Sequence, residues 1–423
     1  MSRFASPSGL RGVVWWSLVG LASLGGCDAI VGAGDRHADP TIVCGPSGCA
    51  CATGFGDCDD NPDNGCETSL DDPKNCGACG NVCDNGKCEN LACACESGFA
   101  ECDGDLATVC ETNVATDGAH CGACTRDCGG GECKDGLCVP QTVPIPDAVY
   151  EFIIVGGEVY YSPQANPGVW HVPVEGGTPK QLDSGTEFAY MLFHESGKIY
   201  WSSDTKILVT DIASGMTDTL ATGQVPAFRL SAGGGKVYWG DVDTVANVVW
   251  IHRTTTTPGG MVEKVVQLLD PKFVQDFAVT SDRVYWNDID QILYSPHDTI
   301  SATPFQKVER PPAYFEPTAT SLLFTSVPSG VYELPLKGGA GQKLADESGY
   351  GVLASDADHV YFVTAEYGSP DPPTLWRTAH SGAEPTLKLA ADPFMLPYLP
   401  LALDDQWIYW LSTQTQAILR VKK

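Results

Sequence analysis

A four-strand pattern recurs seven times along the C-terminal two-thirds of this 423-residue sequence. The clearest copy spans residues 273–309, where four short alternating apolar runs are separated by polar turns. Its second strand carries an aromatic pair, and the matching position recurs at Tyr160, Tyr200, Tyr238, Tyr285, Leu323, Tyr361 and Tyr409. The successive spacings are 40, 38, 47, 38, 38 and 48 residues. One such sheet leaves its apolar faces uncovered, so the copies must pack on one another.

A period near forty residues with four strands per copy is typical of a β-propeller. We therefore predict an all-β fold with a β-propeller over residues 139–423, most simply with seven blades and with six as the alternative. The last copy, at residues 394–423, supplies only three strands. The strand near residues 142–145 is the expected fourth strand, which closes the ring. The recurring aromatic residues are expected to pack between neighbouring blades.

The cysteines define a second region before the propeller. All nineteen lie between Cys27 and Cys138, and eighteen of them form two copies of one pattern, at about residues 44–92 and 93–138. This segment has few large apolar side chains, so disulfides must constrain a small, loop-rich fold. Three pairs share one spacing and are predicted to form local disulfides, namely Cys44 with Cys49, Cys88 with Cys93, and Cys133 with Cys138. The sequence leaves the pairing of the other twelve open.

Two metal-binding alternatives arise in the cysteine-rich region. The pairs Cys76–Cys79 and Cys121–Cys124 have the C-x-x-C spacing of zinc sites, but an exported context favours disulfides. Four acidic residues in one loop make a weak calcium candidate, namely Asp57, Asp59, Asp60 and Asp63. They lack the ligand-and-glycine register of an EF-hand loop, so we expect no metal and no cofactor, with calcium as the single alternative.

The N-terminus indicates export. Arg3 and Arg11 precede a short apolar run at residues 13–24, which ends at two glycines, so residues 1–26 have the layout of a signal peptide. Residues 24–27, Leu-Gly-Gly-Cys, resemble the lipobox of bacterial lipoproteins. That resemblance implies that Cys27 becomes the lipidated first residue of the mature chain.

Two further observations fit a lipid anchor. Without Cys27 the number of cysteines is eighteen, an even number that a fully paired exported domain requires. Residues 28–43 are rich in Gly, Ala, Asp and Pro and resemble a flexible tether. The expected location is therefore the cell envelope, as a membrane-anchored lipoprotein of the outer membrane or cell surface, with the inner membrane as the alternative.

Two family resemblances accompany these patterns. Residues 75–80, Asn-Cys-Gly-Ala-Cys-Gly, resemble the cysteine-rich modules common in exported proteins of myxobacteria, a resemblance that implies no activity. Residues 238–241 (Tyr-Trp-Gly-Asp) and 285–288 (Tyr-Trp-Asn-Asp) resemble the YWTD repeat of low-density lipoprotein receptor propellers. This second resemblance implies a closed propeller used for binding, with six blades where the repeats here number seven.

Charge and motifs limit the possible functions. The formal charge of −28 disfavours nucleic acid as a partner. The sequence contains neither H-E-x-x-H nor G-x-S-x-G. We therefore expect a binding platform without intrinsic catalysis, whose propeller contacts an unidentified protein or glycan of the envelope or exterior. The alternative is a propeller hydrolase or lyase acting on a glycan or peptide, with residues from several blades such as Asp204, Asp241, Asp288 and His359.

Overall fold

The computed structural model describes residues 41–45, 48–59, 61, 65–105, 108–183, 185–223, 227–243, 248–268, 276–288, 290–308, 312–326, 330–347, 351–365, 371–396 and 399–423. Every regular element in these ranges is a β-strand, and no helix that could span a membrane occurs in them. The chain forms two compact units, residues 1–111 and 112–423. The predicted signal peptide and Cys27 lie outside the described residues.

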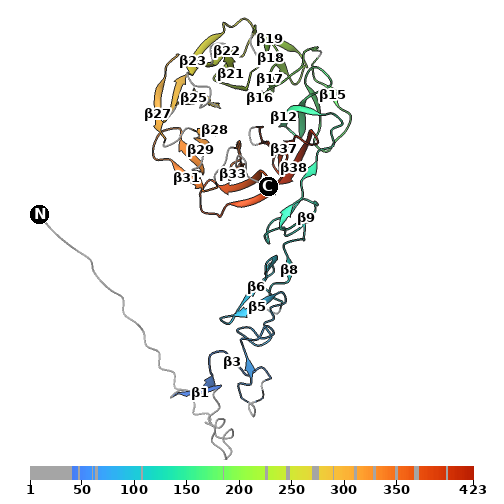
Figure 1. Cartoon of the computed structure of the whole chain (residues 1–423), viewed down its shortest axis with the longest axis vertical. Coiled ribbons are helices and arrows are strands. Elements are labelled where there is room, and N and C mark those ends of the chain that lie inside the picture. Colours follow the sequence, from blue (N-terminus) through green and yellow to red (C-terminus); the bar gives the residue numbers. More distant parts are fainter. Residues whose placement is uncertain are drawn as a thin grey trace, which may run out of the picture. The chain divides into compact units, whose positions relative to one another are not determined.

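Six consecutive antiparallel sheets of four strands form the first six blades (Figure 1). Blades 1 to 3 comprise β12 (Val149–Val155), β13 (Glu158–Pro163), β14 (Trp170–Pro173) and β15 (Lys180–Gln181); β16 (Leu192–Glu195), β17 (Lys198–Ser202), β18 (Lys206–Asp211) and β19 (Thr217–Thr222); β20 (Arg229–Gly233), β21 (Lys236–Asp243), β22 (Val248–Thr255) and β23 (Glu263–Leu268). Blades 4 to 6 comprise β24 (Phe277–Val279), β25 (Arg283–Asp288), β26 (Gln291–Pro296) and β27 (Thr303–Lys307); β28 (Pro312–Pro317), β29 (Ser321–Ser326), β30 (Gly330–Pro335) and β31 (Gln342–Ala345); β32 (Leu353–Ser355), β33 (His359–Thr364), β34 (Thr374–Ala379) and β35 (Leu387–Ala391).

The seventh blade joins the two ends of the propeller. It contains β36 (Ala402–Leu403), β37 (Trp407–Ser412) and β38 (Ala417–Lys422), and its outermost strand is β11 (Gln141–Thr142). Gln141 pairs with Arg420, and the N–H of Val143 donates a hydrogen bond of 2.9 Å to the carbonyl of Ile418. The predicted closure by the strand before the first blade is therefore confirmed.

The innermost strands form a closed ring. Each of them contacts the innermost strand of the next blade, and β36 contacts β12, so the circle is complete. The fold is a seven-bladed β-propeller, and the six-bladed alternative is wrong. Figure 1 shows the seven blades arranged around one axis.

The core lies between adjacent blades, as predicted from the aromatic positions. Trp201, Trp239, Trp286 and Trp410 are almost completely buried. Each core cluster combines side chains of neighbouring blades; Trp286 of blade 4, for example, packs with Ile251 of blade 3. Because an aromatic side chain buries 150–250 Å² in general, these second-strand residues supply most of the packing between sheets.

The cysteine-rich region contains short strand pairs. Its strands are β1 (Ile42–Gly45), β2 (Gly48–Cys51), β3 (Phe55–Gly56), β4 (Thr68–Ser69), β5 (Gly86–Glu89), β6 (Ala92–Cys95), β7 (Phe99–Ala100), β8 (Thr112–Asn113), β9 (Cys133–Lys134) and β10 (Leu137–Cys138). Disulfides join the described cysteines, among them Cys51–Cys66, Cys58–Cys79, Cys76–Cys88, Cys83–Cys93, Cys95–Cys110, Cys121–Cys133 and Cys128–Cys138, and Cys102 and Cys124 are disulfide-bonded too. The repeat is visible in sequence separations of 15, 12 and 10 residues that occur in both copies.

Two of the three predicted local disulfides are wrong. Cys88 and Cys93 do face each other across the β5–β6 hairpin, as Cys133 and Cys138 do across β9–β10. Each sulfur, however, bonds a cysteine of the loop before its hairpin. The backbone ladder already joins the hairpin strands, whereas the observed disulfides tie the preceding loop to the hairpin and close longer loops, which removes more chain entropy. The side chains of the third pair, Cys44 and Cys49, lie outside the described part, so that pair stays a prediction.

The zinc alternative is also excluded by the disulfides. Cys76, Cys79 and Cys121 are all joined to partners outside their C-x-x-C pairs, and Cys124 is disulfide-bonded as well. A sulfur in a disulfide has no thiolate to offer a metal. The C-x-x-C spacing here places two half-cystines in separate cross-links.

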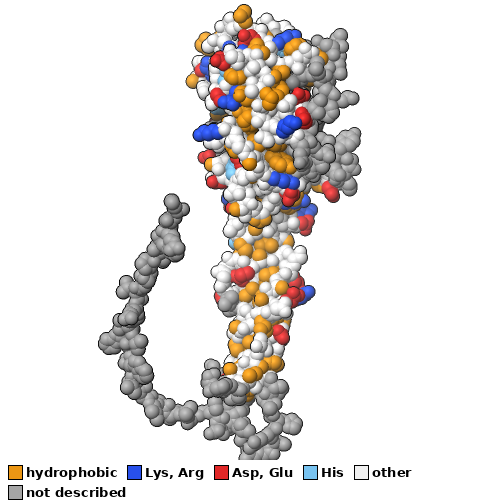
Figure 2. Space-filling view, turned by 90° about the vertical axis from the view of Figure 1, so that its left-hand side faces the viewer, with side chains coloured by type: hydrophobic (Ala, Val, Ile, Leu, Met, Phe, Trp, Pro, Cys, Tyr) orange, Lys and Arg blue, Asp and Glu red, His pale blue; other side chains and the backbone are white. Residues whose placement is uncertain are grey.

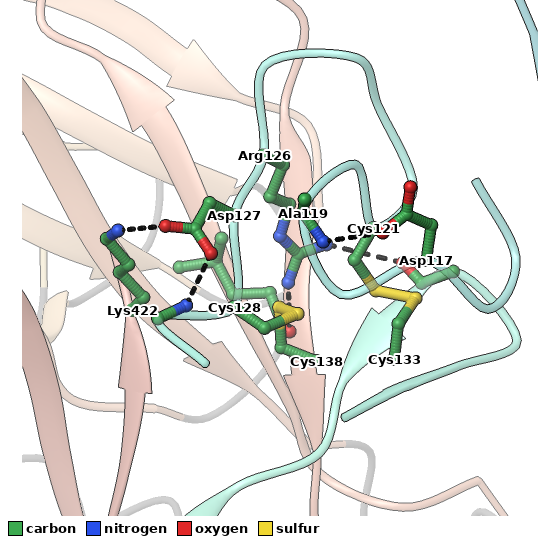
Figure 3. Close-up of a disulfide and its surroundings, with 12 residues drawn as sticks. Asp117, Ala119, Cys121, Arg126, Asp127, Cys128, Cys133, Cys138 and Lys422 are labelled. Atoms are coloured by element: carbon green, nitrogen blue, oxygen red, sulfur yellow. Dashed lines mark hydrogen bonds and ion pairs between the residues drawn. A yellow bond between two sulfur atoms is a disulfide. The ribbon is translucent and has the colours of Figure 1, made fainter. Parts of the chain in front are cut away.

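The second half of the second cysteine repeat belongs to the propeller unit (Figure 3). The guanidinium of buried Arg126 donates hydrogen bonds to the carbonyls of Lys388, at 2.9 Å, and of Leu389, both in β35. Asp127 pairs with Lys422 of the closing blade. The Cys128–Cys138 disulfide packs in the same core cluster as blades 6 and 7. Residues 112–138 are therefore an integral part of the propeller body.

Candidate functional site

Three charged residues occupy the same position in three inner strands. Glu151, Arg229 and Asp276 each precede the inner-strand residue that pairs with the second aromatic residue of the blade. In the sequence each lies nine residues before the recurring tyrosine of its repeat. Because every blade repeats the same geometry around the axis, these side chains lie at one level near the centre of the ring. Alignment of the repeats on the tyrosine would have found them.

A fourth charged residue lies on the same side of an inner strand in blade 5, two positions further along that strand. Glu316 lies in β28, directly after Phe315, whose strand position matches that of Phe277 in blade 4. Because strand side chains alternate, Glu316 points to the same side as the residue before Phe315. The positive charge of Arg229 acts on Glu151, Asp276 and Glu316. We call these four residues the axial cluster.

Arg229 is held in place by Asp276. Its Nε lies 3.0 Å from Asp276 Oδ1, and the Asp276 side chain is only 2% exposed. Asp276 also accepts backbone N–H bonds from Phe277 at 2.8 Å and from Phe315 at 2.9 Å, so both of its oxygens are engaged. The Arg229 side chain keeps 30% of its surface exposed, and one Nη donates only a long bond of 3.5 Å to the Phe315 carbonyl. Part of the Arg229 side chain therefore remains accessible to solvent.

Among the described residues, the carboxyl groups of Glu151 and Glu316 have no hydrogen-bond partner. Burial raises the pKa of Glu151 to about 8 and that of Glu316 to about 7, and Arg229 opposes both shifts. Glu151 is buried, with 5% of its surface exposed, and Glu316 is partly exposed. Near neutral pH the two groups are wholly or partly protonated, so each can both donate and accept hydrogen bonds.

Aromatic side chains lie beside the axial cluster. Tyr150 directly precedes Glu151 at a register irregularity of β12, and it is 44% exposed. Its ring centroid lies 6.1 Å from that of Tyr190, which occupies the equivalent place before β16. A hydrogen bond to Asp204 raises the pKa of Tyr190. The axial end of blades 1 and 2 therefore presents two tyrosine rings next to a buried acid.

The four residues named for the enzymatic alternative do not form one site. Asp204 contacts Tyr190, and Asp241 lies 2.9 Å from His252, a ring that stacks on Trp239. His359 follows the turn between the first two strands of blade 6, at the end of the blade opposite to the turns that follow the second strands. The structure thus separates His359 from the three aspartates.

The acidic loop of the first cysteine repeat gathers carboxylates. Oxygens of Asp57, Asp59 and Glu67 lie within 4.8 Å of one another. The matching group of the next repeat is Glu101, Asp103 and Glu111. Asp59 and Glu67 also accept hydrogen bonds from the backbone of their own loop. Such oxygens suit Ca²⁺, but Asp60 and Asp63 lie outside the described residues, and the calcium candidate stays a prediction.

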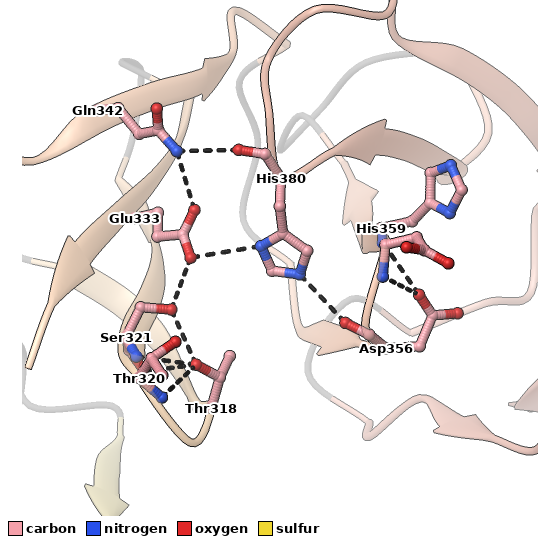
Figure 4. A network of polar contacts seen from close by, with 9 residues as sticks. Thr318, Thr320, Ser321, Glu333, Gln342, Asp356, His359 and His380 are labelled. Carbon is pink, nitrogen blue, oxygen red and sulfur yellow. Dashed lines mark hydrogen bonds and ion pairs between the residues drawn. The ribbon is translucent and has the colours of Figure 1, made fainter.

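A polar network between blades 5 and 6 has a structural role (Figure 4). Glu333 accepts hydrogen bonds from Ser321 at 2.6 Å and from Gln342 at 3.0 Å, and it lies 3.3 Å from the ring of His380. That ring contacts the Asp356 carbonyl at 3.1 Å. Every member is used within the network, so it joins two blades and leaves nothing for a ligand.

A surface hollow of about 410 Å³ lies at the seam between blades 7 and 1. Its lining includes Glu175, which forms an ion pair with Arg420 at 2.7 Å, and Trp407, whose ring lies 4.4 Å below the same guanidinium. These groups satisfy one another across the closing blade. The hollow is therefore part of the ring closure, and the axial cluster remains the better candidate site.

Comparisons with known proteins show the fold alone. No protein-family model and no curated protein matches the sequence. Among solved structures, an oligogalacturonate lyase in complex with manganese is 10% identical, with 65% of this chain and 89% of that chain covered and a TM-score of 0.50. The computationally designed Ika8 protein is 11% identical, with 67% and 98% covered and a TM-score of 0.44. A nidogen/laminin complex is 15% identical, with 47% and 80% covered and a TM-score of 0.34.

Proposed function

We propose that this chain is an exported binding protein whose propeller holds its partner at the axial cluster. One observation carries the proposal: Arg229 is fixed by a buried carboxylate, yet its guanidinium stays exposed opposite two carboxyl groups that lack partners. Groups of this kind are available to a ligand that offers matching hydrogen-bond donors and acceptors. A rigid ring with unsatisfied polar groups at its centre is preorganised for recognition.

The partner is a protein or glycan of the cell envelope or exterior, and not a nucleic acid. The formal charge of −28 repels polyanions. On the face drawn in Figure 2, the Lys and Arg side chains are dispersed among acidic ones and form no basic area. A neutral or weakly charged partner fits this surface.

A pull-down from cell-envelope extract tests the binding proposal. The bait is the mature chain, the test variant is Arg229→Ala, and the control is Lys307→Ala, which removes a cation from the exposed outer strand of blade 4. We expect partners that the wild type and the control retain and the Arg229 variant loses. Identical captures by all three chains, or no capture above empty beads, would contradict the proposal.

The enzymatic alternative rests on a different property of the same residues. A carboxyl group with a pKa of about 7, such as that of Glu316, is suited to general acid–base catalysis. Under this alternative the chain would cleave an envelope glycan or peptide, and Glu316→Gln would abolish product formation without weakening binding. Product analysis by mass spectrometry after incubation with envelope polysaccharides and peptides decides between the two functions.

We further propose that the protein is anchored by a lipid on Cys27. The many disulfides support a location outside the cytoplasm, where such bonds persist. The lipobox-like residues 24–27 and the even number of remaining cysteines support the anchor. Palmitate labelling of the wild type and of Cys27→Ser in an expressing bacterium tests it. Label on the wild type alone is expected, and equal labelling of both chains would contradict it.

A further inference from the structure

The hydrogen-bonding capacity of the axial cluster is unbalanced. Both oxygens of Asp276 are engaged by Arg229 and two backbone N–H groups. Arg229 keeps donors without a close acceptor in the described part of the chain. Within that part, the carboxyl groups of Glu151 and Glu316 make no hydrogen bond, and each can act as donor or acceptor. A ligand bound here must therefore offer hydrogen-bond acceptors to Arg229, and both donors and acceptors to Glu151 and Glu316.

Charged small ligands fit this requirement poorly. An anion satisfies Arg229 but is repelled by Glu151 and Glu316 once they ionise. A cation is repelled by Arg229, and among the described residues the three acids of the cluster do not converge into a metal-ligating group. Hydroxyl groups accept from a guanidinium and donate to a carboxylate, and they bring no charge. A ligand with several hydroxyls therefore satisfies the whole cluster.

The neighbouring tyrosines also favour a ligand with several hydroxyl groups. The rings of Tyr150 and Tyr190 lie 6.1 Å apart beside Glu151, and Tyr150 is 44% exposed. Such rings offer an apolar face next to a polar edge, which suits a ligand that alternates C–H faces with hydroxyl edges. A peptide would instead be bound largely through apolar pockets for its side chains, whereas the axial cluster presents charged groups beside tyrosine rings.

We propose that the occupant of the axial cluster is a glycan, with sugar hydroxyls between Arg229 and the carboxyl groups of Glu151 and Glu316 and a sugar ring against Tyr150. This inference rests on the proposed binding function and names its ligand class. The ligand is a neutral carbohydrate chain, either free or as part of an envelope polysaccharide.

Titration calorimetry of the mature chain tests the ligand class. The probes are neutral oligosaccharides of glucose, mannose and N-acetylglucosamine, and permethylated forms of each serve as probes without hydroxyl groups. We expect saturable binding of at least one oligosaccharide and none of its permethylated form. Tyr150→Ala and Arg229→Ala should each weaken binding about tenfold or more. Trp250→Ala, an aromatic residue on the third strand of blade 3, should leave binding unchanged.

Two readouts keep the test informative. Heat measured in buffers of different ionisation enthalpy reports protons released or taken up when the sugar meets Glu151 and Glu316, and Glu151→Gln should reduce that exchange. Melting temperatures confirm that each variant is folded. Binding of a peptide library, lost in Arg229→Ala, without any oligosaccharide binding would overturn the glycan inference and leave the binding site in place. Binding of neither class, with envelope capture insensitive to Arg229→Ala, would overturn both proposals.

Discussion

Arg126 of the second cysteine repeat donates a buried hydrogen bond to the main-chain carbonyl of Leu389 in the outermost strand of blade 6. A second bond of 2.9 Å reaches the neighbouring carbonyl of Lys388. Burial lowers the pKa of Arg126 to about 10, helped by the nearby charge of Arg377. A disulfide-linked loop thereby covers the edge of a blade that would otherwise expose unpaired backbone groups.

Replacement of Arg126 by alanine should loosen this contact. Two carbonyls would lose a charged donor, and we expect a loss of about 3 kcal/mol in unfolding free energy. Lys134→Ala, which removes an exposed cation from the same segment, is the control. Hydrogen exchange should rise in residues 112–138 and in β35 of the Arg126 variant only. Unchanged protection there would mean that the disulfides alone hold the segment.

Ring closure predicts that an aspartate at one of two nearby valines lowers stability strongly, while an aspartate at the other has little effect. Val143 is 1% exposed and lies beside the closing strand, whereas Val139 is 37% exposed. Val143→Asp buries an unpaired charge and should cost about 3 kcal/mol or more, while Val139→Asp should change stability by less than about 0.5 kcal/mol. Deletion of residues 139–147 should lower the melting temperature sharply. Equal melting temperatures for the two aspartate variants would rule out this closure.

The axial acids predict a fall in stability with rising pH. The pKa of Glu151 is raised from 4.5 to about 8, so between these values the native state holds a proton that the unfolded state has lost. Stability therefore decreases from about pH 4.5 to about pH 8. Glu151→Gln should remove this contribution and stabilise the chain at pH 9 by on the order of 3 kcal/mol. Exposed Glu89→Gln is the control, and parallel pH curves for all three chains would exclude the effect.

The contact between Lys423 and Asp356 predicts a contribution to stability that falls as the pH is lowered. Burial raises the pKa of Asp356, but Lys423 Nζ at 2.7 Å, the backbone N–H groups of His359 and Asp358, and the Tyr361 hydroxyl outweigh it and lower the pKa to about 2. This stabilisation is present above about pH 4 and is lost as the pH falls towards 2. Asp356→Asn should cost about 1–2 kcal/mol at pH 7 and much less at pH 2. A difference in melting temperature that does not depend on pH would contradict this.

Disulfide connectivity can be checked by peptide mapping without reduction. We expect peptides that link Cys76 to Cys88 and Cys83 to Cys93, together with their counterparts Cys121–Cys133 and Cys128–Cys138. A peptide closed by Cys88 and Cys93 should be absent. Its detection would restore the local pairing that the sequence spacing favours.

The fold could be predicted from the sequence because each blade repeats the same pattern of apolar residues. Tyr285 and Trp286 stand in a buried second strand, and each repeat carries a comparable apolar pair at that position, so the period reports the number of blades. The closing strand was predictable for a similar reason, because the last repeat has three strands and one must come from elsewhere. The cysteine pairing was not predictable, since spacing shows which cysteines are near and not which sulfur each side chain faces.

The candidate site was missed because most repeats carry no charged residue at the position of Glu151, Arg229 and Asp276. Arg229 and Asp276 stand in different blades, and only their shared distance from Tyr238 and Tyr285 connects them. Attention to Asp241 and Asp288, which follow the aromatic pairs, selected residues of the second strands, whereas Arg229 and Asp276 lie at the start of the neighbouring inner strands. A charged residue nine positions before the recurring tyrosine of its repeat is the signal that would have identified Glu151, Arg229 and Asp276.

The pairing of Gln141 with Arg420 joins two strands that are made far apart in time. The strand that completes the final blade is synthesised before any of the sheets it joins, and nearly three hundred residues follow before its partner strand is made. A chain truncated within that interval cannot close its propeller. The unpaired strand edges it leaves can pair with another chain, and such a chain is prone to aggregation and degradation.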